Sequence, residues 1–112
     1  MRLWHNPRCS KSRAALALLE EAGVSVEVYH YLEAPLDEGA LDTVLDKLGI
    51  AAAELTRTCE PSWRESALAK DSPDPDIRAA ILAHPILVER PIFETESRAV
   101  IGRPPARVLE LL

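Results

Sequence analysis

The pattern of hydrophobic and polar residues predicts that the chain opens with a strand, a helix and a second strand. Residues 2–5 predict the first strand, which ends at Asn6-Pro7-Arg8 because proline fixes its own φ and restricts its predecessor. A helix is expected from about Ser10 to the cap glycine Gly23. Its apolar face has the i, i+3, i+4, i+7 spacing and comprises Ala15, Leu18, Leu19 and Ala22. Alternation over 24–31 predicts the second strand, which completes a βαβ unit.

The pattern predicts that the middle of the chain is helical. Pro35-Leu36-Asp37 is expected to interrupt the chain. A helix should follow, with Asp37 as a suitable N-cap and Gly49 as the residue that closes it. The expected buried stripe of this helix is Leu41, Val44, Leu45 and Leu48. Residues 52–70 predict two short helical pieces broken at Pro61.

A further helix is expected to start at Asp74-Pro75, with Asp74 as cap and the proline at the first helical position. Its inward residues are expected to be Ile77, Ala80 and Ile81. After it, residues 92–95 and 98–101 predict a hairpin around Glu96-Ser97. Pro104-Pro105 should start a last helix, whose apolar residues are Val108, Leu111 and Leu112.

The predicted order is therefore βαβ, a helical insertion, then ββα. This order predicts an α/β fold with a thioredoxin-like, mixed four-stranded sheet. The length of 112 residues favours one domain over residues 1–112. The chain is 47% hydrophobic and 28% charged, which suits a folded globular protein.

Charge and hydropathy exclude several classes of function. The net charge of −5 argues against a nucleic-acid-binding protein, which usually has a basic face. No apolar stretch approaches the roughly 20 residues that span a bilayer. The N-terminal residues lack an apolar signal core, and the two cysteines form no disulfide framework. We therefore expect a cytoplasmic protein without a membrane partner, and a monomer.

The strongest candidate for chemistry is Cys9, at the predicted turn from strand to helix. Unpaired N–H groups and the helix dipole favour a thiolate at this position. Local positive charge comes from Arg8, Lys11 and Arg13. The Ser12 hydroxyl, three residues on, is placed to donate to the sulfur, and His5 is placed to assist as a cation or a hydrogen-bond donor. A cysteine can also be a small buried hydrophobic residue, but its place at an anion-binding turn favours catalysis.

Position 12 decides what kind of thiol chemistry is possible. A dithiol redox motif would have a cysteine there, but this chain has Ser12. An adduct on Cys9 must therefore be resolved by another molecule or by Cys59. Three scattered histidines and two distant cysteines give no metal-ligand spacing, so no metal is expected, and His30 and His84 are interpreted as structural.

The segment His5-Asn6-Pro7-Arg8-Cys9-Ser10-Lys11-Ser12-Arg13 resembles the active-site loop of the glutaredoxin-coupled arsenate reductases. The resemblance extends in order over nearly the whole chain. It includes Tyr31-Leu32-Glu33, Leu55-Thr56-Arg57, Glu60-Pro61, residues 84–92 from His84 to Ile92, and Ile101-Gly102-Arg103-Pro104-Pro105. The stretches around Cys9 and Arg90 are specific to that family.

The resemblance implies a mechanism without a bound cofactor. In that family the cysteine attacks arsenate, glutathione attacks the adduct, and glutaredoxin reduces the mixed intermediate to release arsenite. The family's three oxyanion-binding arginines match Arg57, Arg90 and Arg103, and its active-site histidine matches His5. The implied partners are thus arsenate, glutathione as reductant, and glutaredoxin. Arginine suits this role because its planar fork of donors fits oxyanions.

Some positions keep a second interpretation. Arg57 could be an ordinary helix-end cation, and Arg103 could simply solvate a turn. The thioredoxin-like fold often has a cis proline beside the active cysteine, so we predict that Arg90-Pro91 is cis. Cys59 departs from the family pattern, and it would point the same way as Arg57 if residues 57–59 were extended.

Two rival functions remain at the level of sequence. A thiol oxidoreductase of the same family with an unknown substrate would keep the reactive Cys9 but would not turn over arsenate. An Spx-type regulator that binds RNA polymerase would usually carry a Cys-x-x-Cys switch, and Ser12 argues against it.

Overall fold

The computed structural model describes residues 1–33 and 36–112. The chain divides into two compact units, one formed by residues 1–34 and 90–112 and the other by residues 35–89. The predicted punctuation at Pro35 lies outside the described residues. The expectation of one domain over residues 1–112 stays a prediction.

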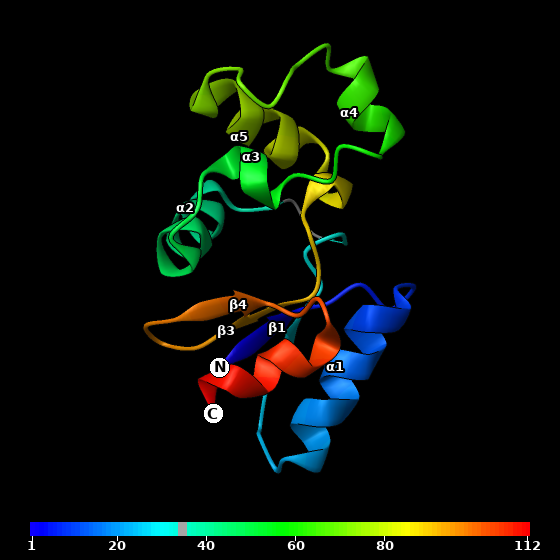
Figure 1. Cartoon of the computed structure of the whole chain (residues 1–112), viewed down its shortest axis with the longest axis vertical. Helices are drawn as coiled ribbons and strands as arrows, with labels where there is room; N and C mark the ends of the chain where they lie inside the picture. The colour runs from blue at the N-terminus through cyan, green and yellow to red at the C-terminus, as the bar shows by residue number, and fades with distance from the viewer. Residues whose placement is uncertain (34–35) are drawn as a thin grey trace. The chain divides into compact units, whose positions relative to one another are not determined.

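The first unit contains a four-stranded mixed sheet in the order β2-β1-β3-β4 (Figure 1). Strand β1 (Arg2–Trp4) pairs in parallel with β2 (Glu27–Tyr29) and antiparallel with β3 (Ile92–Glu94). Strand β3 in turn pairs antiparallel with β4 (Ala99–Ile101). The predicted mixed sheet of four strands is confirmed, and β1 is central because it pairs on both sides.

One face of this sheet packs against α1 (Ser10–Glu21) and the 3-10 helix η2 (Pro105–Leu111), which lie side by side in Figure 1. The buried core between them consists of Leu3, Ala15, Leu19, Phe93, Val100 and Val108. Helix α1 ends at Gly23, whose φ of 77° is left-handed. The N–H groups of Gly23 and Val24 donate to the carbonyls of Glu20 and Leu19, so the predicted cap glycine is confirmed.

Several predicted elements of this unit differ in extent or in type. Only Glu27–Tyr29 of the expected strand 24–31 forms β2, because β1 offers just three residues for pairing. The hairpin strands are likewise shorter, with the turn closed by Thr95 N–H donating to Arg98 O at 2.8 Å. The last helix is a 3-10 helix, and Leu112 is exposed rather than part of an apolar face.

The second unit is helical and contains α2 (Glu38–Leu48), α3 (Ala52–Leu55), α4 (Pro61–Glu65), α5 (Asp74–Ala83) and the 3-10 turn η1 (Pro85–Leu87). The predicted cap of α2 is confirmed, since Asp37 accepts from Ala40 N–H at 3.1 Å. Gly49 closes the same helix with a φ of 69°. Leu41, Val44 and Leu45 are buried as expected, whereas Leu48 is only partly buried.

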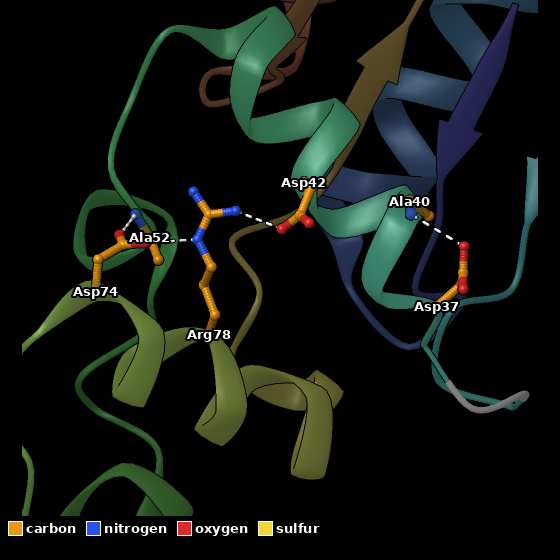
Figure 2. A network of polar contacts seen from close by, with 6 residues as sticks. All are labelled: Asp37, Ala40, Asp42, Ala52, Asp74 and Arg78. Carbon is orange, nitrogen blue, oxygen red and sulfur yellow. Dashed lines mark hydrogen bonds and ion pairs between the residues drawn. The ribbon is translucent and has the colours of Figure 1, made fainter.

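Arg78 of α5 ties the helices of this unit together (Figure 2). Its guanidinium bonds Asp42 of α2 and, within α5, Asp74. Asp74 also accepts from Ala52 N–H, the first residue of α3, at 3.1 Å. Asp74 is therefore the first residue of α5 and not its N-cap as predicted, because its carboxylate caps α3 instead.

Within residues 1–33 and 36–112, no helix combines the length and the apolar content needed to cross a membrane.

Candidate functional site

Asn6 organises the loop that carries Cys9. The strand β1 continues for one more bond, from His5 N–H to Tyr29 O at 3.0 Å, before the chain turns. The Asn6 carbonyl then accepts from Cys9 N–H, and its side-chain oxygen accepts from Arg8 N–H, both at 3.0 Å. Asn6 is buried and thereby fixes both ends of the turn.

Cys9 is the N-cap of α1. Its backbone is extended, with φ −94° and ψ 122°, and its carbonyl accepts the first helical bond from Arg13 N–H at 3.0 Å. The backbone N–H groups of Lys11 and Ser12, in the first turn of α1, act on the Cys9 thiol by lowering its pKa. The thiol is half-buried and therefore keeps access to solvent.

The surroundings of Cys9 favour its thiolate. Burial acts in the opposite direction and raises the pKa of the thiol. The Ser12 N–H, the Arg90 side chain and the Lys11 N–H each lower that pKa, and together they outweigh burial. The charge that acts on the sulfur comes from Arg90, which is distant in the sequence, and not from the arginines within the loop. A lowered pKa gives more nucleophile at neutral pH.

Arg90 and Arg103, two of the three expected oxyanion-binding arginines, lie in the same unit as Cys9. The Arg90 side chain lowers the pKa of the Cys9 thiol, and Arg103 Nη1 donates to the Arg90 carbonyl oxygen at 2.9 Å. The Arg90-Pro91 peptide bond is cis, as predicted. Arg103 thus does more than solvate a turn, because it bonds the backbone that carries Arg90.

Ser12 is buried, but its hydroxyl oxygen bonds His5 and not, as expected, the Cys9 sulfur. The Oγ lies 2.7 Å from His5 Nδ1 and accepts from Asn6 N–H at 3.0 Å. Ser12 acts on Cys9 through its backbone N–H instead, which lowers the pKa of the thiol. The pKa of His5 is lowered by burial, by His30 and by Arg13, so the suggested role of His5 as a cation is disfavoured.

Arg57 and Cys59 lie in the second unit. The Arg57 side chain pairs with Glu60 at 3.2 Å and with Glu89 at 3.8 Å, and its N–H donates to Leu87 O at 2.7 Å. Residues 57–60 form a turn closed by Glu60 N–H donating to Arg57 O at 3.3 Å. The condition for an internal resolving role of Cys59, an extended backbone over residues 57–59, is therefore not met, and Cys59 is exposed.

The sequence interpretation missed two residues of this site. Asn6 was read only as a strand breaker, although asparagine is typical of turns in which its side chain bonds nearby N–H groups. His30 was interpreted as structural, yet its ring lies near that of His5. Among the described residues, no cluster of three or more histidine, cysteine or acidic side chains is arranged to hold a metal.

Comparison with known proteins gives consistent matches over the whole chain. A sequence model of the ArsC family matches residues 4–111. An arsenate reductase of Neisseria meningitidis is 44% identical over 106 residues, which cover 93% of this chain and 91% of the relative. The uncharacterized protein YfgD of Escherichia coli is 45% identical over 114 residues, covering 100% of this chain and 96% of the relative.

A solved structure has the same fold. The arsenate reductase from Vibrio cholerae matches with a TM-score of 0.93 and 39% identity, covering 100% of this chain and 98% of that chain. The predicted thioredoxin-like α/β fold is confirmed by this match.

Proposed function

Because the chain belongs to the ArsC family, we propose that it reduces arsenate to arsenite, with Cys9 as the nucleophile. The observation that carries the proposal is the set of donors around the Cys9 sulfur. Two helix N–H groups and the Arg90 guanidinium lower the pKa of this thiol against the effect of burial. The arsenate reductase names of relatives such as the Neisseria meningitidis protein support the choice of substrate.

The first step is attack of the Cys9 thiolate on arsenic. A sulfur–arsenic bond forms, and one arsenate oxygen leaves as hydroxide or, after protonation, as water. Both reactants are anions, so the step requires cations at the site. Arg90 is the cation that lowers the pKa of the Cys9 thiol, and the planar guanidinium fork suits arsenate oxygens as negative charge builds up.

Arg103 and Arg57 are the other two arginines that we propose to bind arsenate. Arg103 both steadies the Arg90 backbone and supplies a guanidinium in the same unit. Arg57 is paired with Glu60 and Glu89 in the second unit, so binding of arsenate would exchange these carboxylates for arsenate oxygens. We expect its replacement to weaken substrate binding more than it slows attack by Cys9.

The electrons come from external thiols in this proposal. Reduction of As(V) to As(III) takes two electrons, which two thiols supply as they join in a disulfide. Ser12 stands where a neighbouring resolving thiol would be, and Cys59 lies in an exposed turn of the second unit. We therefore propose glutathione as the attacking thiol and glutaredoxin as the reductant of the mixed intermediate, in a reducing compartment such as the cytoplasm.

The test is arsenate-dependent oxidation of NADPH in the presence of glutathione, glutathione reductase and glutaredoxin. We expect turnover by the native chain, loss of turnover in Cys9→Ser, and retention in Cys59→Ser. An assay that lacks only glutaredoxin tests whether turnover depends on it. Loss of turnover in Cys59→Ser would contradict external resolution. A folded native chain without turnover, but with a reactive Cys9, would instead support a thiol oxidoreductase with another substrate.

A further inference from the structure

Asn6 begins a β-turn that ends at the nucleophile. The bond from Cys9 N–H to the Asn6 carbonyl, at 3.0 Å, closes this turn of four residues. Asparagine at the first position and proline at the second are typical of such turns, because proline presets its own φ and keeps the preceding residue extended. Pro7 has no N–H, so the side chain of Asn6 bonds the next one along, and Oδ1 accepts from Arg8 N–H at 3.0 Å.

Asn6 is also bonded to helix α1. Its N–H donates to the Ser12 hydroxyl oxygen at 3.0 Å, and Ser12 is fully buried. The N–H, the carbonyl and Oδ1 of Asn6 are thus all bonded to residues 8–12. Asn6 is only 5% exposed, so little water is at hand to replace a bond that is removed. Asn6 therefore joins the end of β1, the turn and the first turn of α1.

The turn fixes the backbone of Cys9 on both sides. The N–H of Cys9 is bonded to Asn6, and its carbonyl accepts from Arg13 N–H at 3.0 Å. With both groups bonded, Cys9 is held as the N-cap of α1 at φ −94° and ψ 122°. Cysteine has a single rotatable bond before its sulfur, so this backbone direction limits where the sulfur lies relative to the first turn of α1.

We propose that Asn6 is a positioning residue for Cys9, which acts through the bond that its Oδ1 accepts from Arg8 N–H. The proposal deepens the proposed function and rests on it only in naming Cys9 as the nucleophile. Asn6 does not need to touch substrate in this role. It keeps the turn closed, so that the thiol stays beside the first turn of α1 before a reactant arrives. Without this bond the turn opens more often, and the thiol spends less time in that position.

The experiment is the rate of Cys9 alkylation by iodoacetamide as a function of pH, in the full chain with Cys59→Ser. It compares the native residue with Asn6→Ala and Asn6→Ser. These two variants differ by one hydroxyl group, which can accept from the N–H two residues on, though more weakly than asparagine does. In Asn6→Ala we expect the midpoint to move to higher pH and the rate near neutral pH to fall about two- to tenfold, the range for one hydrogen bond. Asn6→Ser should lie between Asn6→Ala and the native chain.

Two results would overturn the proposal. An unchanged profile in Asn6→Ala would show that Asn6 does not act on the thiol. Equal changes in Asn6→Ala and Asn6→Ser would show that packing of the carboxamide, and not its acceptor oxygen, is responsible.

Thr95→Ala is the matched control. In the hairpin turn of the same unit, Thr95 Oγ1 accepts from Arg98 N–H at 3.1 Å, so this variant also loses a side-chain acceptor for a backbone N–H. We expect urea unfolding to show a loss of stability in Thr95→Ala, while its Cys9 alkylation profile stays native. A profile that moves as far in Thr95→Ala as in Asn6→Ala would mean that general loosening of the unit is responsible, which contradicts the proposal.

The second measurement is the exchange of backbone amide hydrogens, followed by NMR in the same variants. We expect Cys9 N–H to exchange faster in Asn6→Ala and at the native rate in Thr95→Ala. A moved alkylation profile with native exchange at Cys9 N–H would show that Asn6 does not act through the turn, and would also overturn the proposal. Neither measurement uses arsenate, so failure of the proposed function would appear separately, as an absence of turnover by the native chain.

Discussion

Arg103 donates from Nη1 to the backbone carbonyl oxygen of Arg90 at 2.9 Å. Arg90 in turn lowers the pKa of the Cys9 thiol, so Arg103 supports the backbone of the residue that favours the thiolate. A second bond joins the same segments, from Gly102 N–H to Pro91 O at 2.8 Å. Arg103 thus has a structural effect on the nucleophile that is separate from any contact with substrate.

Replacement of Arg103 should therefore change the thiol even without arsenate. In Arg103→Gln the Arg90 backbone loses a charged donor, Arg90 is held less firmly against the sulfur, and we expect the pKa of Cys9 to rise. The measurement is the rate of Cys9 alkylation near neutral pH in a Cys59→Ser background. Arg98→Gln, in the exposed turn of the hairpin, is the control and should leave the rate unchanged. Equal rates in both variants would assign Arg103 to substrate binding alone.

Gly102→Ala should destabilise the first unit. A Cβ at Gly102 would lie 2.9 Å from Pro91 Cγ and 3.0 Å from Val108 Cγ1, and both neighbours are ring or core atoms with little room to move. We expect a loss of about 1–3 kcal/mol in the free energy of unfolding, as for other overpacked sites. Urea unfolding measures it. In the control Gly39→Ala the nearest atom is Oδ2 of Asp37, at 3.1 Å, which caps α2 but can shift more than a ring or core atom, so the loss should be smaller.

His5 should make the folded chain lose stability as the pH falls. Its pKa is lowered in the folded state, chiefly by burial, so the unfolded chain takes up the proton first. The stabilisation is complete above the ordinary histidine pKa of about 6.5 and is lost as the pH falls toward the folded value. Urea unfolding across this range should show the advantage of the native chain over His5→Gln shrinking with falling pH. A constant difference would contradict a buried neutral His5.

Glu94 should be important for the stability of the sheet. Its carboxylate is 4% exposed and accepts from Arg2 Nε at 2.8 Å and from Trp4 Nε1 at 3.1 Å. In Glu94→Leu the buried indole N–H loses its acceptor, and we expect a loss of about 1–3 kcal/mol. Glu94→Gln keeps an acceptor oxygen and should cost less. Urea unfolding, monitored by tryptophan fluorescence, compares the free energy of unfolding of the two variants. Equal losses would mean that the charge of Glu94, and not its role as an acceptor, is responsible.

The Arg78 network should contribute modestly to the second unit and depend on salt. Asp42 and Asp74 have side chains that are 48% and 42% exposed, so each ion pair should be worth about 0.2–1 kcal/mol. Arg78→Gln should reduce stability at low salt more than at high salt, because salt screens exposed pairs. Lys70→Gln, an exposed cation of the same unit, is the control. If salt did not alter the loss of stability in Arg78→Gln, the packing of the aliphatic part of the arginine side chain would be responsible instead of its ion pairs.

The Arg78 network also predicts that the folded chain loses stability at acidic pH. The pKa of Asp74 is lowered, first by its bond with Arg78 and then by the Ala52 N–H. A carboxyl group with a lowered pKa stabilises the folded chain above the ordinary value of about 4, and this contribution is lost as the pH falls toward the folded value. Asp74→Asn should remove that part of the acid sensitivity in urea unfolding.

Local sequence patterns specify the elements whose ends depend on neighbouring residues. The Asp37 cap, the left-handed Gly49 and the cap at Gly23 are bonds within one turn of a helix, so a local pattern specifies them. The position of Cys9 at the start of α1 followed for the same reason. The motifs around it also indicated the family before any contact was known.

Features that depend on partners far along the chain follow only from the folded structure. Strand β2 is shorter than its alternating pattern because its length is set by pairing with β1. The cation at the Cys9 sulfur proved to be Arg90, and the partner of the Ser12 hydroxyl proved to be His5. Hydrogen bonds and charge interactions act over a few ångströms, and only folding brings such residues within that distance. The pattern of the sequence therefore located the nucleophile, while the fold selected the groups that tune it.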